Sequence, residues 1–284
     1  MNPMADEPHR IAYQTLRGLV ADDILGEAAK VAFFMILSLF PLLVLTLSVA
    51  GMVGGQAAYE LILGAVHGMI PQEGAAFIAQ YVEEVAFERA PEGLSVGFAV
   101  TLFLASLVFF RLAEALNVVY GLPRRSWFSR RVVAMIVLLL GTLVLLTGAT
   151  IILMLPELTG FVGVGPMWVL FRWPVALVLQ VVVLALVFRM LPNRGGSAHW
   201  PGIIIGATVG GVLGSLATLG FRFYLTRFAE LDAMYGAFGG PVVLILWLYL
   251  LTLALLFAAK LAAVLEMHGG AHVFPVTGRP LSGG

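Results

Sequence analysis

The sequence contains no cysteine, so disulfides, thiolate metal sites and cysteine nucleophiles are all excluded. Charged residues are also scarce: they make up 11% of the chain, and the formal net charge is zero. A soluble domain has about a quarter of its residues charged. A protein that binds nucleic acid needs a basic surface, so this charge balance argues against a nucleic-acid partner.

Sequence signatures of enzymes are scarce as well. There is no glycine-rich phosphate loop, no GxSxG motif and no pair of carboxylates within an apolar run. The histidines are scattered over the chain: His9, His67, His199, His268 and His272. His268 and His272 have i, i+4 spacing, but no third metal ligand accompanies them. We therefore expect no catalytic residue, no bound metal and no cofactor.

Apolar residues, by contrast, make up 61% of the chain, and the mean hydropathy is +1.00. Crossing about 30 Å of hydrocarbon takes roughly 20 apolar residues per helix, and six runs reach that length. They are approximately 28–53, 94–117, 132–155, 168–188, 202–225 and 238–265. The expected fold is all-α, a polytopic membrane protein with a six-helix transmembrane domain over residues 28–265.

Three other segments surround these runs. Residues 1–27 have apolar side chains at roughly helical spacing, which predicts an amphipathic helix on the cytoplasmic membrane surface or a short helix packed on the domain. Residues 54–93 predict short interfacial helices on the outer side, with a re-entrant hairpin as the alternative. Residues 266–284 predict a flexible cytoplasmic tail.

The distribution of arginine predicts the orientation in the membrane. If the N-terminus is cytoplasmic, nine arginines flank the spans on the inside: Arg10, Arg17, Arg124, Arg125, Arg130, Arg131, Arg189, Arg194 and Arg279. Three flank them on the outside: Arg89, Arg222 and Arg227. We therefore expect both termini in the cytoplasm. We also expect the doublets Arg124–Arg125 and Arg130–Arg131 to contact lipid headgroups.

The second apolar run ends in polar residues, which are costly inside a bilayer. Arg111, Glu114 and Asn117 lie on one side of the predicted helix, near its cytoplasmic end. Lys260 reaches a similar depth in the sixth run. Either these groups extend to the headgroups, or Glu114 points inward, contacts Arg111 or Lys260, and lines a cytoplasmic vestibule.

Proline and glycine predict irregular or closely packed helices. Pro41 lies inside the first run and predicts a kink, either static or mobile, where Ser38 can satisfy the loosened backbone. In the fifth run, glycine at every fourth residue predicts a smooth face for a close helix contact, either fixed or sliding. These glycines are Gly202, Gly206, Gly210 and Gly214.

The stretch "YGAFGGP" precedes the sixth run. Gly236, Gly239 and Gly240 leave the backbone flexible, and Pro241 suits the first turn of a helix. The stretch is either a plain junction between loop and helix or a helix start whose free amides bind an anion.

Several stretches, taken together and in order, resemble the YihY/BrkB family of bacterial inner-membrane proteins. They are "AAKVAFFMILSLFPLL", "AEALNVVYG" with the following arginine doublets, "FRMLPN", "HWPGIIIGA" and "MYGAFGGPVVLILWLYLLTLALL". The resemblance implies six transmembrane helices in the bacterial inner membrane. It also implies an association with export of envelope lipids or lipopolysaccharide precursors. The old family label, ribonuclease BN, has no support in these residues.

Two places depart from the family pattern. Phe33 and Phe34 stand where the family usually has tyrosine, and Lys260 stands where it commonly has glutamate. The lysine reverses a charge, which puts any family role of that carboxylate in doubt for this chain.

Three functions are compatible with these sequence features to different degrees. A transporter, exporter or flippase of a lipid-like, anionic substrate would use the cytoplasmic arginines for headgroups. A membrane scaffold or envelope assembly protein would use packed helices to bind partners. A membrane-embedded hydrolase or nuclease has the least support. The expected partners are membrane lipids and a lipid-like substrate, with a homo-oligomer as a further option, and no nucleic acid.

The predicted orientation can be tested with one introduced thiol, because the chain has no cysteine of its own. Ser126→Cys places that thiol between the two arginine doublets. A membrane-impermeant maleimide should label this variant in inside-out vesicles and leave it unlabelled in intact cells. Labelling from the periplasm in intact cells would show the opposite orientation.

Overall fold

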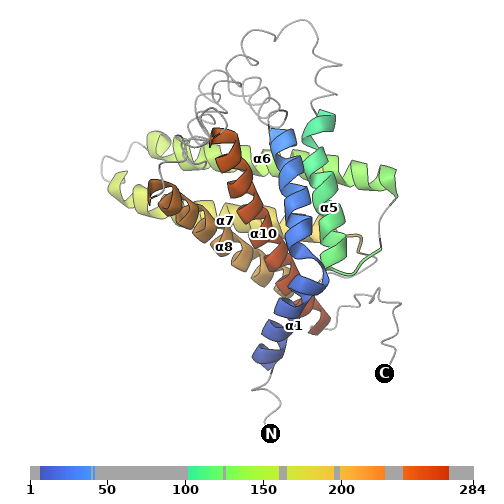
Figure 1. The fold of residues 1–284 in the computed structure, drawn as a ribbon. Helices are drawn as coiled ribbons and strands as arrows, with labels where there is room; N and C mark the ends of the chain where they lie inside the picture. Colours follow the sequence, from blue (N-terminus) through green and yellow to red (C-terminus); the bar gives the residue numbers. More distant parts are fainter. Residues whose placement is uncertain are drawn as a thin grey trace, which may run out of the picture.

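The computed structural model describes residues 7–39, 41, 102–123, 126–159, 165–194, 199–227 and 239–268. Regular structure within these ranges is entirely helical, which confirms the all-α class for the described part of the chain. The helices with defined bounds are α1 (Glu7–Ala21), α5 (Leu107–Val119), α6 (Trp127–Thr159), α7 (Gly165–Met190), α8 (Trp200–Arg227) and α10 (Gly239–His268) (Figure 1). Residues 24–39 and 102–105 are helical too.

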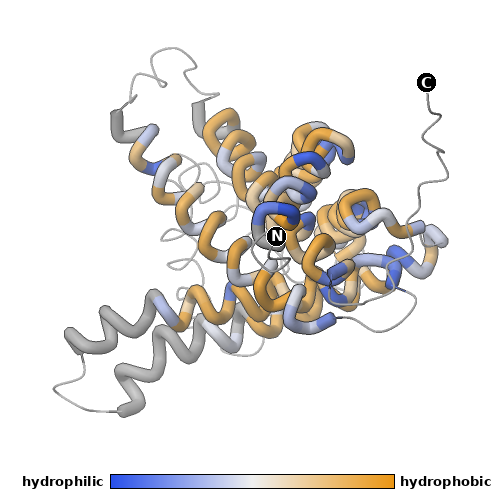
Figure 2. The backbone as a smooth tube through the Cα atoms, turned by 90° about the horizontal axis from the view of Figure 1, so that it is seen from below, coloured by the Kyte–Doolittle hydropathy of each residue, from blue (hydrophilic) through white to orange (hydrophobic). Residues whose placement is uncertain are grey.

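Four described stretches are long and apolar enough to cross a bilayer: Leu102–Val119, Trp127–Val144, Trp200–Tyr224 and Val242–His268. Another apolar stretch, Pro174–Met190, is shorter. Figure 2 shows the described helices orange over most of their length. Many large apolar side chains are exposed, for example Leu219 and Phe223 on α8, and such a surface suits lipid rather than water. The chain is therefore a membrane protein with several apolar helices.

The count of six spans stays a prediction, because most of the first run and all of 54–93 lie outside the described residues. The later runs agree with α6, α7, α8 and α10 to within about five residues at each end. The largest difference is at α6, which begins five residues before the predicted 132 and so includes Arg130 and Arg131. Hydropathy falls at these arginines, but arginine is a good helix former, so the backbone helix continues through them.

The N-terminal helix α1 packs against α10. A turn at Asp22 and Asp23 separates it from the helical segment 24–39. Asp23 has φ 49°, and its carboxylate accepts the Gly26 N–H (3.3 Å) at the start of that segment, in the manner of a helix N-cap. The placement of α1 on a membrane surface stays a prediction.

The helices from α5 to α10 form a closed circuit of contacts. α5 packs against α6 and α10, α8 packs against α7 and α10, and α6 packs against α7. Figure 1 shows α6 crossing α5 at a steep angle, whereas segment 24–39, in blue, runs alongside α5. The Ser38 hydroxyl donates to the Leu104 carbonyl (3.1 Å) and so joins that segment to the helix before α5. The kink predicted at Pro41 falls where the neighbouring residues lie outside the described ranges.

The glycine face of α8 packs closely against α10. A Cβ added at Gly206 would lie 2.5 Å from the Ala262 Cβ and 2.9 Å from the Ala258 carbonyl oxygen. A Cβ added at Gly210 would lie 2.9 Å from the Ala258 Cβ. A Cβ added at Gly202 would lie 3.0 Å from the Glu266 Cγ, and one added at Gly214 would lie 3.1 Å from the Gln180 Nε2 of α7. We call the contact of Gly202, Gly206 and Gly210 with α10 the α8–α10 seam.

The start of α10 includes part of the glycine-rich stretch. The helix begins at Gly239, so Gly240 and Pro241 lie in its first turn, where proline is tolerated because its missing N–H has no helical acceptor. Gly236 lies outside the described residues. Whether free amides at this helix start bind an anion stays a prediction.

The α8–α10 seam predicts opposite effects for the same substitution at two positions on one helix. Gly206→Ala should destabilise the protein by roughly 1–3 kcal/mol through overpacking. Gly220→Ala is the matched control, because a Cβ added there meets nothing within 4 Å, and it should be neutral or slightly stabilising since alanine favours helix. Thermal unfolding of the two variants in the same detergent gives the comparison. Equal melting temperatures would contradict the close contact.

Candidate functional site

Most of the buried core lies at one end of the helix circuit. It joins the end of α5, the end of α7, the start of α8, the last part of α10 and the start of segment 24–39. Among its fully buried members are Leu116, Phe188, Ile203 and Ala262. We call this region the junction. Charged and polar side chains enter it from several helices, and each of them needs a partner to offset the loss of water.

The end of α5 is fixed by its backbone. Gly121 has φ 65°, its N–H donates to the Val118 carbonyl (3.0 Å), and the Leu122 N–H donates to the Asn117 carbonyl (2.8 Å). This is the Schellman arrangement, which favours glycine at the left-handed position. Asn117 then bonds across the junction, since its side-chain oxygen accepts the backbone N–H of Asn193 (2.7 Å) just after α7.

A buried ion pair joins the α7–α8 connection to α10. Arg194 pairs with Glu266, whose side chain is fully buried, and it also donates to the Phe188 carbonyl (2.9 Å). The guanidinium lies over the Tyr120 ring, 4.4 Å from its centroid. Burial raises the pKa of the Tyr120 phenol, so this group stays neutral at physiological pH. These contacts hold the ends of three helices together without an excess charge.

Lys260 takes part in a second pair at the junction. Its ammonium group donates to the Asp22 carboxylate (2.6 Å) and to the Val119 carbonyl (3.2 Å). Its alkyl chain lies directly against Gly18 of α1, so a larger residue there would have to displace the lysine chain. Lys260 therefore binds α1 and the end of α5 to α10.

The charged residues of α5 meet two arginines at the start of α6 in a separate group, which we call the arginine cluster: Arg111, Glu114, Arg130 and Arg131. Glu114 accepts from Arg111 (2.7 Å) through one carboxylate oxygen and from Arg130 through the other. Arg111 also lies over the Phe34 ring of segment 24–39, 4.5 Å from its centroid. One carboxylate thus binds two guanidinium groups from two crossing helices.

Arg131 is the most buried arginine of the cluster, with 5% of its surface exposed. Its guanidinium donates to the Phe103 carbonyl (2.6 Å) and lies 3.5 Å from the centroid of the Phe103 ring. Within the described part of the chain, no carboxylate lies at ion-pair distance from it. The cluster therefore carries three positive charges and one negative charge among the described residues.

The depth of the cluster also matters. Arg111 lies eight residues before the end of α5, which is about 12 Å along the helix axis. The described apolar stretch Leu102–Val119 continues on both sides of it. Arg111 is therefore placed within the length of one candidate span and away from its ends, whereas Arg130 and Arg131 lie near the start of another, Trp127–Val144.

The structure separates the residues that the sequence grouped. It places Glu114 against Arg111, but it places Lys260 against Asp22 instead of Glu114. Asn117 bonds to the α7–α8 connection and lies outside the arginine cluster. Arg130 and Arg131, which we expected to contact headgroups, point toward α5. Arg124 and Arg125 lie outside the described residues.

Sequence reasoning missed the Arg194–Glu266 pair and the partner of Lys260. Glu266 is the only acidic residue in the α10 sequence, and a lone carboxylate at the end of an apolar run is a signal that it has a specific partner. Asp22 gave no such signal, because it stands in a polar segment beside a second aspartate.

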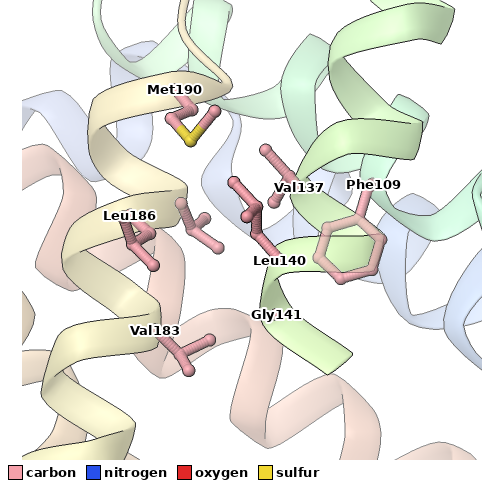
Figure 3. Close-up of a pocket in the computed structure, with 8 residues that line it drawn as sticks. Phe109, Val137, Leu140, Gly141, Val183, Leu186 and Met190 are labelled. Carbon is pink, nitrogen blue, oxygen red and sulfur yellow. The ribbon is translucent and has the colours of Figure 1, made fainter. Parts of the chain in front are cut away.

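Two pockets lie near these groups. The first, between α5, α6 and α7, is lined by apolar residues such as Phe109, Val137 and Met190 (Figure 3). At about 10 Å³ it can hold no more than a water-sized group. The second measures about 250 Å³ and lies between α1 and α10, beside Lys260 and His268. Neither pocket includes a residue of the arginine cluster.

The Arg194–Glu266 pair should be strongly coupled. Glu266→Gln leaves a buried guanidinium without its counter-charge and should cost about 3–5 kcal/mol of stability. Combining it with Arg194→Met should cost less than the sum of the two single changes. The Glu27–Lys30 pair is the control, because Lys30 is 62% exposed and such pairs couple by under about 1 kcal/mol. Unfolding of both mutant cycles in detergent measures the difference, and strict additivity at Arg194 and Glu266 would contradict the pairing.

Comparison with known proteins places the chain in a family. Residues 15–273 match the family model described as Virulence factor BrkB. The ribonuclease-like protein YfkH of Bacillus subtilis is 25% identical over 255 residues, covering 85% of this chain and 90% of its own length. A UPF0761 membrane protein of Tolumonas auensis is 26% identical, covering 84% and 79%. One from Nitrosospira multiformis is 30% identical, covering 84% and 57%.

No solved structure matches this chain. The family model spans most of the sequence, from the middle of α1 to beyond the end of α10. The resemblance inferred from the ordered stretches is therefore confirmed, and the protein is a membrane protein of the BrkB family.

Proposed function

We propose that this protein is a transporter, exporter or flippase that moves a lipid-like, anionic substrate across the bacterial inner membrane. The observation that carries the proposal is the arginine cluster, whose excess of positive charge lies within two candidate spans, at Arg111 in the middle of one and at Arg130 and Arg131 near the start of the other. Ionised groups within spans are costly and commonly mark the path of a substrate or ion. In this proposal both termini are cytoplasmic, the chain has no enzymatic activity, and its partners are membrane lipids.

The surroundings of the cluster support an amphipathic substrate. Arg111 is partly accessible, with 42% of its side chain exposed. Phe33 and Leu37, one turn apart on segment 24–39, are exposed apolar residues near Phe34, which carries the Arg111 guanidinium. The anionic head of an amphipathic substrate would pair with the arginines, and its apolar chains would lie on the apolar surface beside them.

Ribonuclease activity, suggested by the name of the Bacillus subtilis relative, is not part of this proposal. Binding of RNA depends mainly on attraction between a basic surface and phosphates. The chain has a formal net charge of zero, and its charged residues make up 11% of the total.

The second candidate function is a membrane scaffold or envelope assembly protein. The α8–α10 seam favours it, because backbones that approach this closely make a rigid surface suited to holding partners. A scaffold does not need the excess charge of the arginine cluster. Transport is therefore the function that accounts for more of the described residues.

Transport can be measured with the full-length protein reconstituted into lipid vesicles that contain fluorescent phosphatidylglycerol. Dithionite destroys the label in the outer leaflet, so a flippase should expose the inner-leaflet label as well. Arg131→Gln should slow this movement by about tenfold, if the lost bond is one charged hydrogen bond. Arg189→Gln, which removes the same charge at the end of α7, should move lipid at the normal rate.

If the inner-leaflet label in vesicles with wild-type protein stays protected from dithionite for as long as in protein-free vesicles, the protein does not move such lipids. A normal rate for Arg131→Gln would show that the lipid path does not use the cluster. Circular dichroism of each reconstituted variant checks that it is folded.

A further inference from the structure

We infer that the arginine cluster is a binding site for a lipid phosphate that carries two negative charges, a phosphomonoester headgroup. This inference rests on the proposed function, because the bound lipid is taken to be the transported substrate or a close analogue. It adds the chemical class of the headgroup and the residues that bind it.

The charge of the cluster selects the headgroup. Arg111, Arg130 and Arg131 supply three positive charges, and Glu114 offsets one of them. The remainder, among the described residues, is two positive charges. In an apolar setting, uncompensated charge is unfavourable, so a ligand that supplies two negative charges balances the site, whereas a phosphodiester supplies only one.

The cluster also has unused hydrogen-bond donors. The Nε atoms of Arg111, Arg130 and Arg131 are all buried and have no partner within the described part of the chain. Buried polar atoms in proteins are normally hydrogen-bonded, so three unpartnered donors in one cluster call for an acceptor. The Nε of Arg194 at the junction is unpartnered too, so the excess of charge is what distinguishes the cluster. A phosphate group provides several acceptor oxygens, and its geometry fits the planar fork of arginine.

Aromatic rings hold the guanidinium groups in place. Arg131 lies over Phe103 and Arg130 lies over Phe110, the latter at 4.8 Å from the ring centroid. Together with the Phe34 contact of Arg111, these rings restrict the side chains before any ligand arrives. Binding then costs less side-chain entropy than it would for free arginines. The rings also lower the local polarity, which strengthens the attraction to a phosphate.

Arg111 is the most accessible arginine of the cluster. Leu104 lies seven residues earlier, so it lies on the same face of the helix as Arg111; Leu104 is exposed and Arg111 is partly exposed. Phe33 and Leu37 are exposed on the neighbouring segment 24–39. These apolar side chains offer a surface for acyl chains, while the phosphate reaches the guanidinium groups. This favours a phosphate attached to a lipid over free phosphate.

The test measures binding to the full-length protein in detergent, with three lipids of matched acyl chains: phosphatidic acid, phosphatidylglycerol and phosphatidylcholine. At pH 8, phosphatidic acid should bind about tenfold more tightly than phosphatidylglycerol, if the second charge gains one further charged hydrogen bond. Phosphatidylcholine should bind most weakly. Equal binding of phosphatidic acid and phosphatidylglycerol would overturn the inference.

A pH series provides an internal check, because a phosphomonoester loses its second charge below a pKa of about 6. The preference for phosphatidic acid over phosphatidylglycerol should therefore shrink strongly at pH 5. The charged groups facing the ligand are the three arginines and Glu114 from α5 and α6, while segment 24–39 contributes Phe34. Any change in their own charge affects both lipids, so the ratio isolates the ligand. A ratio independent of pH would contradict selection by charge.

Three variants assign the site. Arg131→Gln should weaken phosphatidic acid binding by about tenfold, and Arg131→Lys should restore only part of it, since lysine keeps the charge and lacks the fork. Glu114→Gln removes the competing carboxylate and should tighten binding, whereas a purely structural role for Glu114 would weaken it. Arg189→Gln is the matched control and should bind normally.

The outcomes separate this inference from the proposed function. Lipid movement without a preference for phosphatidic acid leaves transport intact and overturns the phosphomonoester site. Arg131-dependent binding of phosphatidic acid, without movement of labelled phosphatidic acid in the same vesicle assay, supports the site and contradicts transport. Competition by inorganic phosphate at concentrations similar to those of the lipid would overturn the lipid assignment in favour of a free phosphate.

Discussion

The Arg194–Glu266 pair is the interaction on which the arrangement of the helices depends most. A carboxylate with no exposed surface cannot remain ionised without a close cation, and a guanidinium supplies it from the α7–α8 connection. Asn193, next to Arg194, also binds Asn117 at the end of α5. The short α7–α8 connection therefore fixes the positions of α10 and α5 as well, and the apolar core fills the space between these helices.

The two groups of charges differ in how well they are balanced. At the junction, Arg194 is offset by Glu266 and Lys260 by Asp22, so each charge has its counterpart. Such pairs mainly fix geometry, because their attraction is largely offset by the loss of water. In the arginine cluster, the carboxylate of Glu114 pairs with two of three guanidinium groups, and Arg131 has no carboxylate partner among the described residues. The ion pairs at the junction have equal positive and negative charge, which is consistent with a structural role. The arginine cluster has more positive than negative charge, which favours binding of an anion.

Hydropathy predicted the apolar helices well, because a stretch of about 20 apolar residues has few other stable arrangements. Glycine spacing likewise predicted a close contact for Gly206 and Gly210, although not its partner, α10. The partners of the charged residues were not predictable. Helical spacing places Glu114 and Arg111 on one face, but only the crossing of α6 over α5 brings Arg130 to Glu114. That crossing angle depends on packing between distant segments, which the order of residues does not encode locally.

The α8–α10 seam has a mechanical consequence. Since the Gly206 backbone lies so close to the Ala262 and Ala258 positions, no side chain larger than a methyl group separates α8 from α10 there, and the two helices meet almost backbone to backbone. The contacts between α5 and α6 are of another kind, since long arginine side chains span the gap there. Such side chains can change rotamer and follow a displaced partner. A displacement between α8 and α10 would therefore have to break a direct contact of backbones, whereas one between α5 and α6 would first meet side chains that can adjust.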